Sequence, residues 1–476
     1  METPIQTEPQ TGPQSFCLRT IRSARNRART ISLGLALVLP LFRLSRAFGQ
    51  EDDVGYRLSY YQEDDHRMKV DTDLWQYNVK FNDNVSMNGN VVIDAISGAT
   101  PTGAPPQSQW KYQNFNSLYQ TDYQNAYAFE YAQNIAQNQT LYNGGYITYQ
   151  QLTNGAAVYA NQTAPSLATN SANQSLQTIT NNPSYRNNKV PLTHMHDYRT
   201  AFSLNLPLTF GQHEISPSFS YSEESDYISF AGALNYSISL NDKNTVVSGG
   251  WAHNTDSVRN DMFVWVPKNT DNMFVGLMQL FGPKAYLTVN ASLSFERGYL
   301  ADPYRGVMLA SELQSNPSDP ALSPEVRPRH RNSQILYVAW DQFITPLNGS
   351  YELSYRFFHD TYGIFANTTE LDWHQKIGRH VVVTPMFRYY VQNAADFYYI
   401  LVPDNNNVLP GYYSSDYRLS QFESFATGVT VTWRVYKHLS FDASYMRYVM
   451  RGLDGVISQS AYPSANVYSL GLRLWF

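Results

Sequence analysis

Polar and apolar side chains alternate along most of the chain, in segments of about 8–20 residues that turn residues separate. Side chains two positions apart lie on the same face of a β-strand, so this alternation predicts strands with one apolar and one polar face. The last segment is the clearest, because Tyr468, Leu470, Leu472, Leu474 and Phe476 share one face. The pattern predicts sixteen strands, over residues 54–61, 70–82, 85–97, 196–210, 213–223, 226–241, 244–256, 272–281, 284–299, 332–345, 349–359, 364–377, 380–393, 417–436, 439–451 and 464–476.

Short and long connections alternate between these segments. Every second connection is minimal, whereas the longest are 98–195, 257–271, 300–331 and 394–416. Short turns on one rim and long loops on the other are typical of outer-membrane barrels. The sequence therefore predicts an all-β fold, a transmembrane antiparallel up-and-down β-barrel of about 16 strands (14–18), with short periplasmic turns and long extracellular loops. A soluble barrel with an apolar interior has the same alternation and is the alternative.

The N-terminal segment has the composition of a secretory leader. Five arginines between Arg19 and Arg29 precede an apolar run from Ile31 to Phe42, and Ala47-Phe48-Gly49 follows. This order predicts a signal peptide over residues 1–49 and a barrel domain over 50–476. The apolar run is 12 residues long, which is too short for a spanning helix of about 20 residues. A membrane anchor or a disordered leader is the alternative.

Composition narrows the function classes. Without the leader the chain has 27 basic and 37 acidic residues, a net charge of −10, which argues against a nucleic-acid partner. Its only cysteine, Cys17, lies in the leader, so we expect no disulfide and no thiolate metal site in the barrel. We expect no cofactor. The 37 Tyr, 24 Phe and 8 Trp are too many for a disordered chain and suit strands and aromatic girdles.

The predicted strand faces place charged side chains inside the barrel. On residues 202–210 the apolar face would contact lipid, and Ser203, Asn205 and Thr209 would point inward. Both signs of charge occur on the inward faces, which indicates either a broad polar channel or a charge-filled interior. The expected lumen charges are Lys80, Asp94, Glu296, Glu352, Arg356, Glu370, Asp372, Arg388, Arg434, Asp442 and Arg473.

Residues 98–195 interrupt the strand pattern. They begin with the Pro-rich segment Thr100 to Pro106 and continue as an Asn/Gln/Tyr-rich stretch, with a short helix expected near 125–137. Three interpretations are open: a partly ordered surface loop, a plug inside the lumen, and a surface that binds glycan or a partner. The tyrosines proposed for the third are Tyr112, Tyr119, Tyr123 and Tyr127.

Several motifs resemble one family. They are Glu51-Asp-Asp-Val-Gly-Tyr-Arg57, Tyr60-Tyr-Gln-Glu-Asp-Asp65, Asp94-Ala-Ile-Ser-Gly-Ala-Thr-Pro-Thr-Gly103, Tyr299-Leu-Ala-Asp-Pro-Tyr-Arg305, Arg327-Pro-Arg-His-Arg331, Tyr355-Arg-Phe-Phe-His-Asp-Thr-Tyr-Gly-Ile364 and Arg388-Tyr-Tyr-Val-Gln-Asn-Ala-Ala-Asp-Phe-Tyr398. Outside the 98–195 insertion, they resemble an uncharacterised family of bacterial outer-membrane barrels, domain of unknown function 3570. The resemblance implies the barrel fold, but it supplies no activity, because the family has none assigned. The resemblance also implies genes encoded near a flavin transferase and thioredoxin-like proteins, which hints at redox or extracytoplasmic assembly work.

The motifs cluster at the expected long-loop rim. One interpretation is structural, with Asp-Pro turns and Arg–Asp pairs that hold the loops together; the other is a mouth that selects solutes. The rim residues are Asp64, Asp65, Ser97, Gly98, Thr100, Pro101, Asp302, Pro303, Tyr304, Arg305, Arg329, Arg331, Asp360 and Asp396.

Candidate chemistry is sparse. No Ser–His pairing suggests a membrane-embedded hydrolase, so we expect no enzyme and no catalytic residue. His194 and His196 share one face of an extended segment and are a weak candidate for copper or zinc. No other metal ligands are expected.

These observations predict a porin-like channel or transporter for small polar solutes in a Gram-negative outer membrane. The alternative is a non-conducting barrel that docks partners in an envelope assembly or electron-transfer system. The expected partners are outer-membrane lipid and, because the terminal aromatic strand resembles the signal that barrel-assembly machinery reads, that machinery through Phe476.

Overall fold

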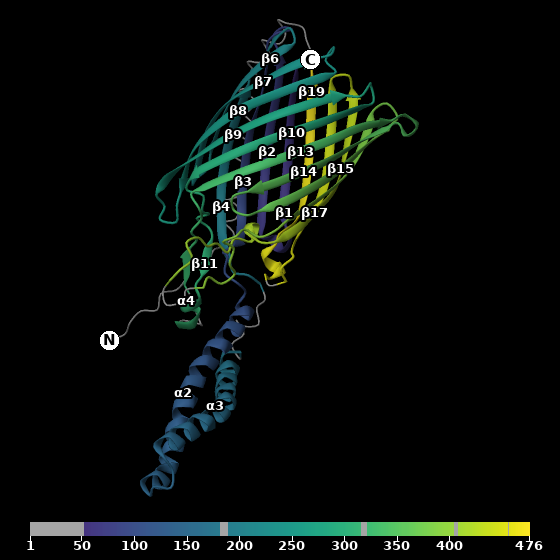
Figure 1. The fold of residues 1–476 in the computed structure, drawn as a ribbon. Coiled ribbons are helices and arrows are strands. Elements are labelled where there is room, and N and C mark those ends of the chain that lie inside the picture. The colour runs from purple at the N-terminus through teal and green to yellow at the C-terminus, as the bar shows by residue number, and fades with distance from the viewer. Residues whose placement is uncertain (1–51, 181–188, 316–320, 404–407, 456) are drawn as a thin grey trace, which may run out of the picture.

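A computed structural model describes residues 52–180, 189–315, 321–403, 408–455 and 457–476. Seventeen strands form one antiparallel sheet that closes on itself (Figure 1). β4 and β5 both pair with β6 and are separated only by Leu206-Pro207, so they make one wall strand and the barrel has sixteen. The strands are β1 (Asp53–Glu63), β2 (Met68–Lys80), β3 (Ser86–Pro101), β4 (Leu192–Asn205), β5 (Leu208–Phe210), β6 (His213–Glu223), β7 (Tyr227–Leu240), β8 (Thr245–Arg259), β9 (Trp265–Leu280), β10 (Ala285–Gly298), β13 (His330–Ile344), β14 (Gly349–Asp360), β15 (Phe365–Ile377), β16 (Val381–Gln392), β17 (Phe422–Tyr436), β18 (Leu439–Gly452) and β19 (Ser464–Trp475).

The first and last strands close the barrel. β1 pairs with β19 in the register Gly55↔Arg473, and the backbones of Asp52 and Phe476 exchange hydrogen bonds of 3.3 and 3.0 Å. The predicted closed barrel is therefore confirmed. The predicted leader, residues 1–49, lies outside the described residues.

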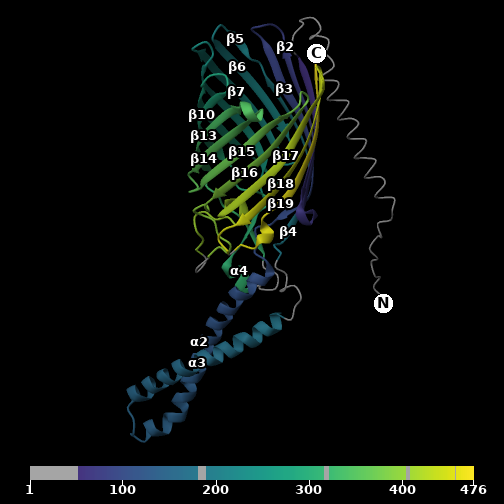
Figure 2. The same ribbon diagram turned by 90° about the vertical axis from the view of Figure 1, so that its right-hand side faces the viewer.

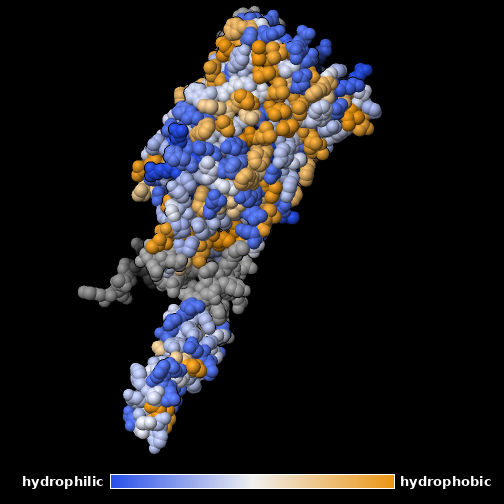
Figure 3. Space-filling view, in the orientation of Figure 1, coloured by the Kyte–Doolittle hydropathy of each residue, from blue (hydrophilic) through white to orange (hydrophobic). Residues whose placement is uncertain are grey.

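The barrel wall is apolar outside and polar inside. Leu470 of β19 and Leu293 of β10 point outward and are 63% and 45% exposed, as expected for side chains whose natural solvent is lipid. On the opposite face, the hydroxyls of Ser59 and Ser469 meet inside the barrel at 2.9 Å. Figure 3 shows apolar residues gathered on the outer wall. This arrangement is the reverse of a soluble barrel with an apolar interior.

The prediction of a long loop over 257–271 is wrong. β8 continues to Arg259 and β9 begins at Trp265, so the connection is reduced to residues 260–264. The Arg259 guanidinium lies 5.0 Å from the Trp265 ring centroid, which fastens the end of this hairpin. β17 also begins later than expected, because 417–419 form a 3-10 helix.

The insertion between β3 and β4 is a long helical hairpin. α2 (Gln107–Asn143) and α3 (Tyr149–Thr180) lie against each other and project away from the long-loop rim (Figures 1 and 2), so they do not fill the lumen. The short helix expected near 125–137 is thus part of a much longer one. The helices pack through five alanines of α3 that are each 0% exposed and spaced four apart: Ala156, Ala160, Ala164, Ala168 and Ala172. No helix in the described part of the chain is long and apolar enough to cross a membrane.

Two long loops pack together over the long-loop end of the barrel, and we call them the roof. They are the described residues of 299–329, which contain β11 (Gly306–Met308), α4 (Ala310–Ser315) and β12 (Leu322–Pro324), and those of 393–421. Val307 and Val402 are fully buried between the loops and pack with Tyr413. Backbone hydrogen bonds also join them, for example Tyr413 N–H to the Val326 carbonyl at 2.8 Å. The roof therefore has its own small core.

Candidate functional site: a chamber beneath the roof

The first roof segment crosses the mouth of the barrel. This segment follows β10, and its Tyr304 hydroxyl donates to Asp226, the last residue before β7. The Arg305 guanidinium then donates to the Thr100 hydroxyl of β3 at 2.8 Å, and Gly306 N–H donates to the Thr102 carbonyl at 2.7 Å. β10 and β3 are separated by several wall strands on either side, so this segment spans the lumen.

A buried charge network joins the two roof loops. Asp416 is 1% exposed, and its carboxylate accepts from Arg327 at 2.8 Å and from Arg418 at 2.5–2.9 Å. Arg418 also pairs with Asp302, and Arg327 pairs with Glu325 at 2.7 Å. The Arg305 guanidinium lies 3.9 Å from Asp416. Roof closure therefore depends on several desolvated ion pairs, in which loss of one partner is costly.

The pKa values of the two buried carboxyl groups of the network, Asp416 and Glu325, shift in opposite directions. Burial alone would raise the pKa of Asp416, but Arg418, Arg327 and Arg305 outweigh it and hold that pKa below its usual range. Burial raises the pKa of Glu325, and Arg327 offsets this only in part. The ionised form is thus strongly favoured at Asp416 and disfavoured at Glu325.

Beneath the roof lies a cavity of about 730 Å³. Roof residues Leu300, Tyr304 and Leu419 line it together with Arg356 and Tyr390 of the barrel wall. A second cavity of about 620 Å³ lies in the short-turn half of the lumen and is lined mainly by Asn, Gln, Ser, Gly and Ala. The lumen is therefore hollow at both levels, and the upper level, which we call the chamber, is covered by the roof.

The expected lumen charges all lie on inward strand faces, and most are paired. The ion pairs are Lys80–Asp83 (3.2 Å), Asp94–Arg199 (2.6 Å), Glu296–Lys268 (3.5 Å), Glu370–Arg388 (3.6 Å), Asp442–Arg57 (3.3 Å) and Arg473–Asp53 (2.9 Å). Glu352 accepts from the Tyr337 hydroxyl at 3.3 Å, and Asp372 lies directly opposite Glu352 on the next strand. Arg434 lies over the Trp475 ring and Arg356 over the Phe358 ring.

The structure brings many of the expected rim residues into contact, and most of them hold loops. Asp64 binds Arg447, Asp65 binds Lys189, and Asp360 binds Arg331 at 2.6 Å. Two glycines allow close approach of other groups: a Cβ on Gly98 (φ 133°) would lie 1.9 Å from the Arg67 carbonyl oxygen, and one on Gly363 (φ 79°) 2.3 Å from Asp396. Two of the expected rim residues are exposed, Arg329 and Asp396. Of the rest, Ser97 and Pro101 lie in β3, and Pro303 lines the cavity. These contacts favour the structural interpretation of the motifs.

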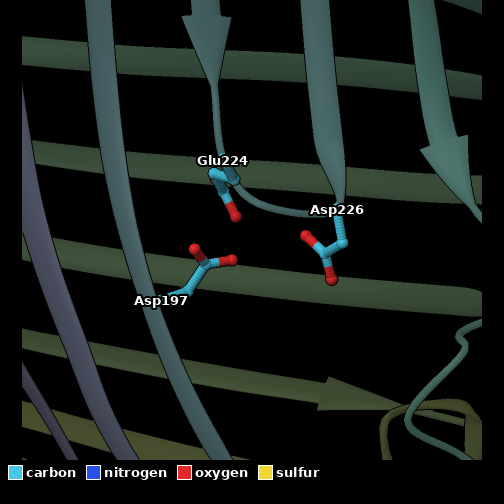
Figure 4. A group of neighbouring side chains, drawn as sticks. All are labelled: Asp197, Glu224 and Asp226. Carbon is cyan, nitrogen blue, oxygen red and sulfur yellow. The ribbon is translucent and has the colours of Figure 1, made fainter.

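Three carboxyl groups meet at the chamber wall, those of Asp197, Glu224 and Asp226 (Figure 4). Their oxygens lie within 4.8 Å of one another. Two of these carboxylates already accept hydrogen bonds from protein hydroxyls: Ser225 donates to Asp197 at 3.0 Å, and Tyr304 donates to Asp226. Burial raises the pKa of Glu224, and Arg199 partly offsets this. His194 and His196 lie elsewhere, exposed on the outward face of β4, and do not belong to this group.

The sequence did not single out Glu325, Asp416 or Arg418, although they form the centre of the roof network. All three lie in the roof loops, and the predicted strand over 417–436 wrongly includes Arg418. Their partners are up to 116 residues away in the chain. The Asp-Tyr-Arg run at 416–418, next to two serines, is the one local sign of a capped turn: Asp416 accepts from Arg418 N–H at 3.0 Å.

A closed antiparallel barrel of sixteen strands, apolar outside and polar inside, defines an outer-membrane-type β-barrel protein. Within this class, the chain belongs to the family described as protein of unknown function (DUF3570), whose sequence profile matches residues 41–266 and 265–461. The resemblance expected from the motifs is thereby confirmed. The matched range also runs through 98–195, which we expected to lie outside the resemblance. A comparison with functionally curated proteins finds no match.

Solved barrels with a similar fold are remote in sequence. CdiB from Acinetobacter baumannii is 9% identical with a TM-score of 0.41, and the match covers 90% of this chain and 60% of CdiB. OccK5 (OpdH) from Pseudomonas aeruginosa is 7% identical with a TM-score of 0.37, covering 90% of this chain and 98% of OccK5. The loop L8 deletion mutant of OmpT, an outer membrane protein of Vibrio cholerae, is 8% identical with a TM-score of 0.37, covering 89% and 98%. This chain thus spans about 60% of the length of CdiB.

Proposed function

We propose that this protein resides in a Gram-negative outer membrane and passes a small polar solute through a lumen that the roof gates. The observation that carries the proposal is the hollow lumen, with cavities of about 730 and 620 Å³ at its two levels. Paired charges on the wall allow water to fill such a lumen without a strong preference for one sign of ion. The short turns and both ends of the barrel would face the periplasm, and the roof and α2–α3 the exterior.

Purified protein in planar lipid bilayers tests the passage. In KCl we expect stable insertion with a low, intermittent conductance, because the roof covers the mouth in its resting arrangement. Fluorescence of a labelled protein reports insertion independently. Inserted protein that shows no conductance at any voltage would contradict the proposal.

A second candidate is a barrel that docks a partner through the α2–α3 hairpin. The favouring observation is the tip of the hairpin, where Tyr146 and Tyr149 are 81% and 66% exposed. Residues 107–180 contain only three charged residues, Lys111, Asp122 and Glu130. A weakly charged surface with exposed tyrosines suits a neutral glycan or a protein partner.

Deletion of residues 107–188, replaced by a short Gly-Ser linker, tests whether the hairpin belongs to the pore. The ends of the insertion lie together, since Thr102 N–H donates to the Pro191 carbonyl at 3.0 Å, so the barrel should still close. We expect the single-channel conductance of this variant to equal that of the full chain within about 20%, because the hairpin lies outside the lumen. A several-fold change in conductance would show instead that the hairpin controls the pore.

A further inference from the structure

One cation of the chamber has no counter-charge in the part of the chain that the structure describes. Five basic side chains line the cavity, and four of them pair with carboxylates: Lys268 with Glu296, Arg331 with Asp360, Arg327 with Glu325 and Asp416, and Arg418 with Asp302 and Asp416. Arg356 of β14 is the fifth. Among the described residues, no hydrogen bond or ion pair reaches its guanidinium, whose one marked contact is the Phe358 ring at 5.6 Å.

The carboxylates nearest to Arg356 on the wall are committed to other groups. Arg356 lies opposite Tyr337 on β13 and Thr368 on β15. One step below, Glu370 pairs with Arg388 at 3.6 Å, and two steps below, Glu352 accepts from the Tyr337 hydroxyl. Above, Asp360 holds Arg331 at 2.6 Å. A guanidinium with five donors and no acceptor of its own thus faces an open cavity.

The wall around Arg356 is apolar and aromatic. Phe358, Tyr362, Ile364, Tyr390 and Leu419 line the same cavity, and they belong to one packed cluster with Phe397. The Tyr362 ring is fixed edge-on against Phe397, with centroids 4.8 Å apart, and its hydroxyl donates to the Pro328 carbonyl at 3.1 Å. An apolar wall with one oriented polar group is the usual composition of a small-molecule site.

We propose that the chamber binds an aromatic or cyclic monocarboxylate, with its carboxylate on Arg356 and its ring against Phe358 and Tyr390. Guanidinium and carboxylate fit as two parallel hydrogen bonds, and the ring covers aromatic surface that otherwise faces water. The chamber, at about 730 Å³, is large enough for such a solute. This inference rests on the proposed function, because the solute reaches the chamber through the lumen.

Equilibrium binding of benzoate, measured by calorimetry on the purified full-length protein in neutral detergent, tests the site. Wild type should bind benzoate more tightly than acetate, which lacks the ring, and than benzyl alcohol, which lacks the charge. R356Q should weaken benzoate binding roughly ten- to hundredfold, as expected for loss of a hydrogen bond to a charged group. R356K should restore part of the loss, because lysine keeps the charge without the planar fork.

A double variant, R388Q/E370Q, is the matched control. It removes a neighbouring arginine of the same wall together with its partner, so the lumen charge is unchanged, and benzoate affinity should stay within about twofold of wild type. Equal benzoate affinity in wild type and R356Q, or equal affinity for acetate and benzoate in wild type, overturns the site. Heat-modifiable migration on gels checks that each variant is folded. Conductance in KCl without benzoate is measured in parallel. A protein that conducts but does not bind benzoate supports the channel and contradicts the binding site. A protein that binds benzoate but does not conduct supports the binding site and contradicts the channel.

Discussion

D416N should open the roof. The substitution keeps the shape of the side chain but removes the buried charge that Arg327 and Arg418 contact and that Arg305 approaches. Breaking a buried ion pair from one side costs about 3–5 kcal/mol, because the remaining charge stays desolvated. At about 1.4 kcal/mol per tenfold, the opening equilibrium of the roof should shift by a factor of about 10² or more. The barrel wall does not contain these contacts and should keep its stability.

Hydrogen exchange and conductance report the opening. The amides of Val402 and Tyr413 bond between the roof segments, so their exchange should accelerate in D416N, while amides in the middle of β13 should not change. Open-channel time in planar bilayers should rise in parallel. Unchanged exchange would contradict the importance of the network; faster exchange with unchanged conductance would show that the roof does not gate the lumen.

E325Q provides the comparison. Glu325 is also buried and also contacts Arg327, but its pKa is raised, so its ionised form contributes less to roof stability than that of Asp416. A carboxyl group with a raised pKa stabilises the folded roof at low pH, and this contribution is lost as the pH rises through the pKa in the folded state. The lowered pKa of Asp416 has the opposite effect. Its contribution to roof stability is present above the ordinary pKa of an aspartate and is lost only in strong acid. At pH 7, where glutamine resembles the favoured neutral form of Glu325, E325Q should therefore change roof opening by less than about tenfold.

The barrel could be predicted from the sequence because it depends on a local rule. Each wall strand shows period-two alternation in its own residues, and closure follows from the even number of strands and the matching ends. The rule also assigned the inward charges, from Lys80 near the short-turn rim to Arg356 in the chamber. It failed at 257–271, where polar residues such as Asn269, Thr270 and Asp271 continue strands that extend beyond the expected apolar zone.

The roof and the hairpin could not be predicted in the same way. The roof forms from tertiary pairs between loops, such as Arg305 with Thr100 across 205 residues, which leave no periodic signal. The hairpin helices have no broad apolar stripe, because they pack through small alanines at every fourth residue of α3, and most of their other residues are polar and uncharged. The unpaired state of Arg356 is likewise a property of the folded wall, since only strand register shows which carboxylates already have partners.

F476S should reduce assembly in cells by several-fold without weakening the folded barrel. The Phe476 side chain is 41% exposed and points outward, whereas its backbone forms the last rung of the closure with Asp52. Serine keeps those backbone bonds, so the barrel should refold into detergent or lipid vesicles with the same yield and the same heat-modifiable migration as wild type. The loss should appear only in the outer-membrane fraction of cells, because the aromatic terminus is proposed to be read by the assembly machinery.

F210S is the matched control for that prediction. Phe210 ends β5 on the same rim and is 57% exposed, so the substitution removes a similar apolar area from the outer face. If exposed aromatic surface at the rim merely anchors the barrel in lipid, both variants should lose outer-membrane protein equally. If the terminal position itself is recognised, F476S should lose several-fold more than F210S, while both refold alike in vitro. Equal losses in cells would therefore remove the assembly role of Phe476 and leave it as one more residue of the aromatic girdle.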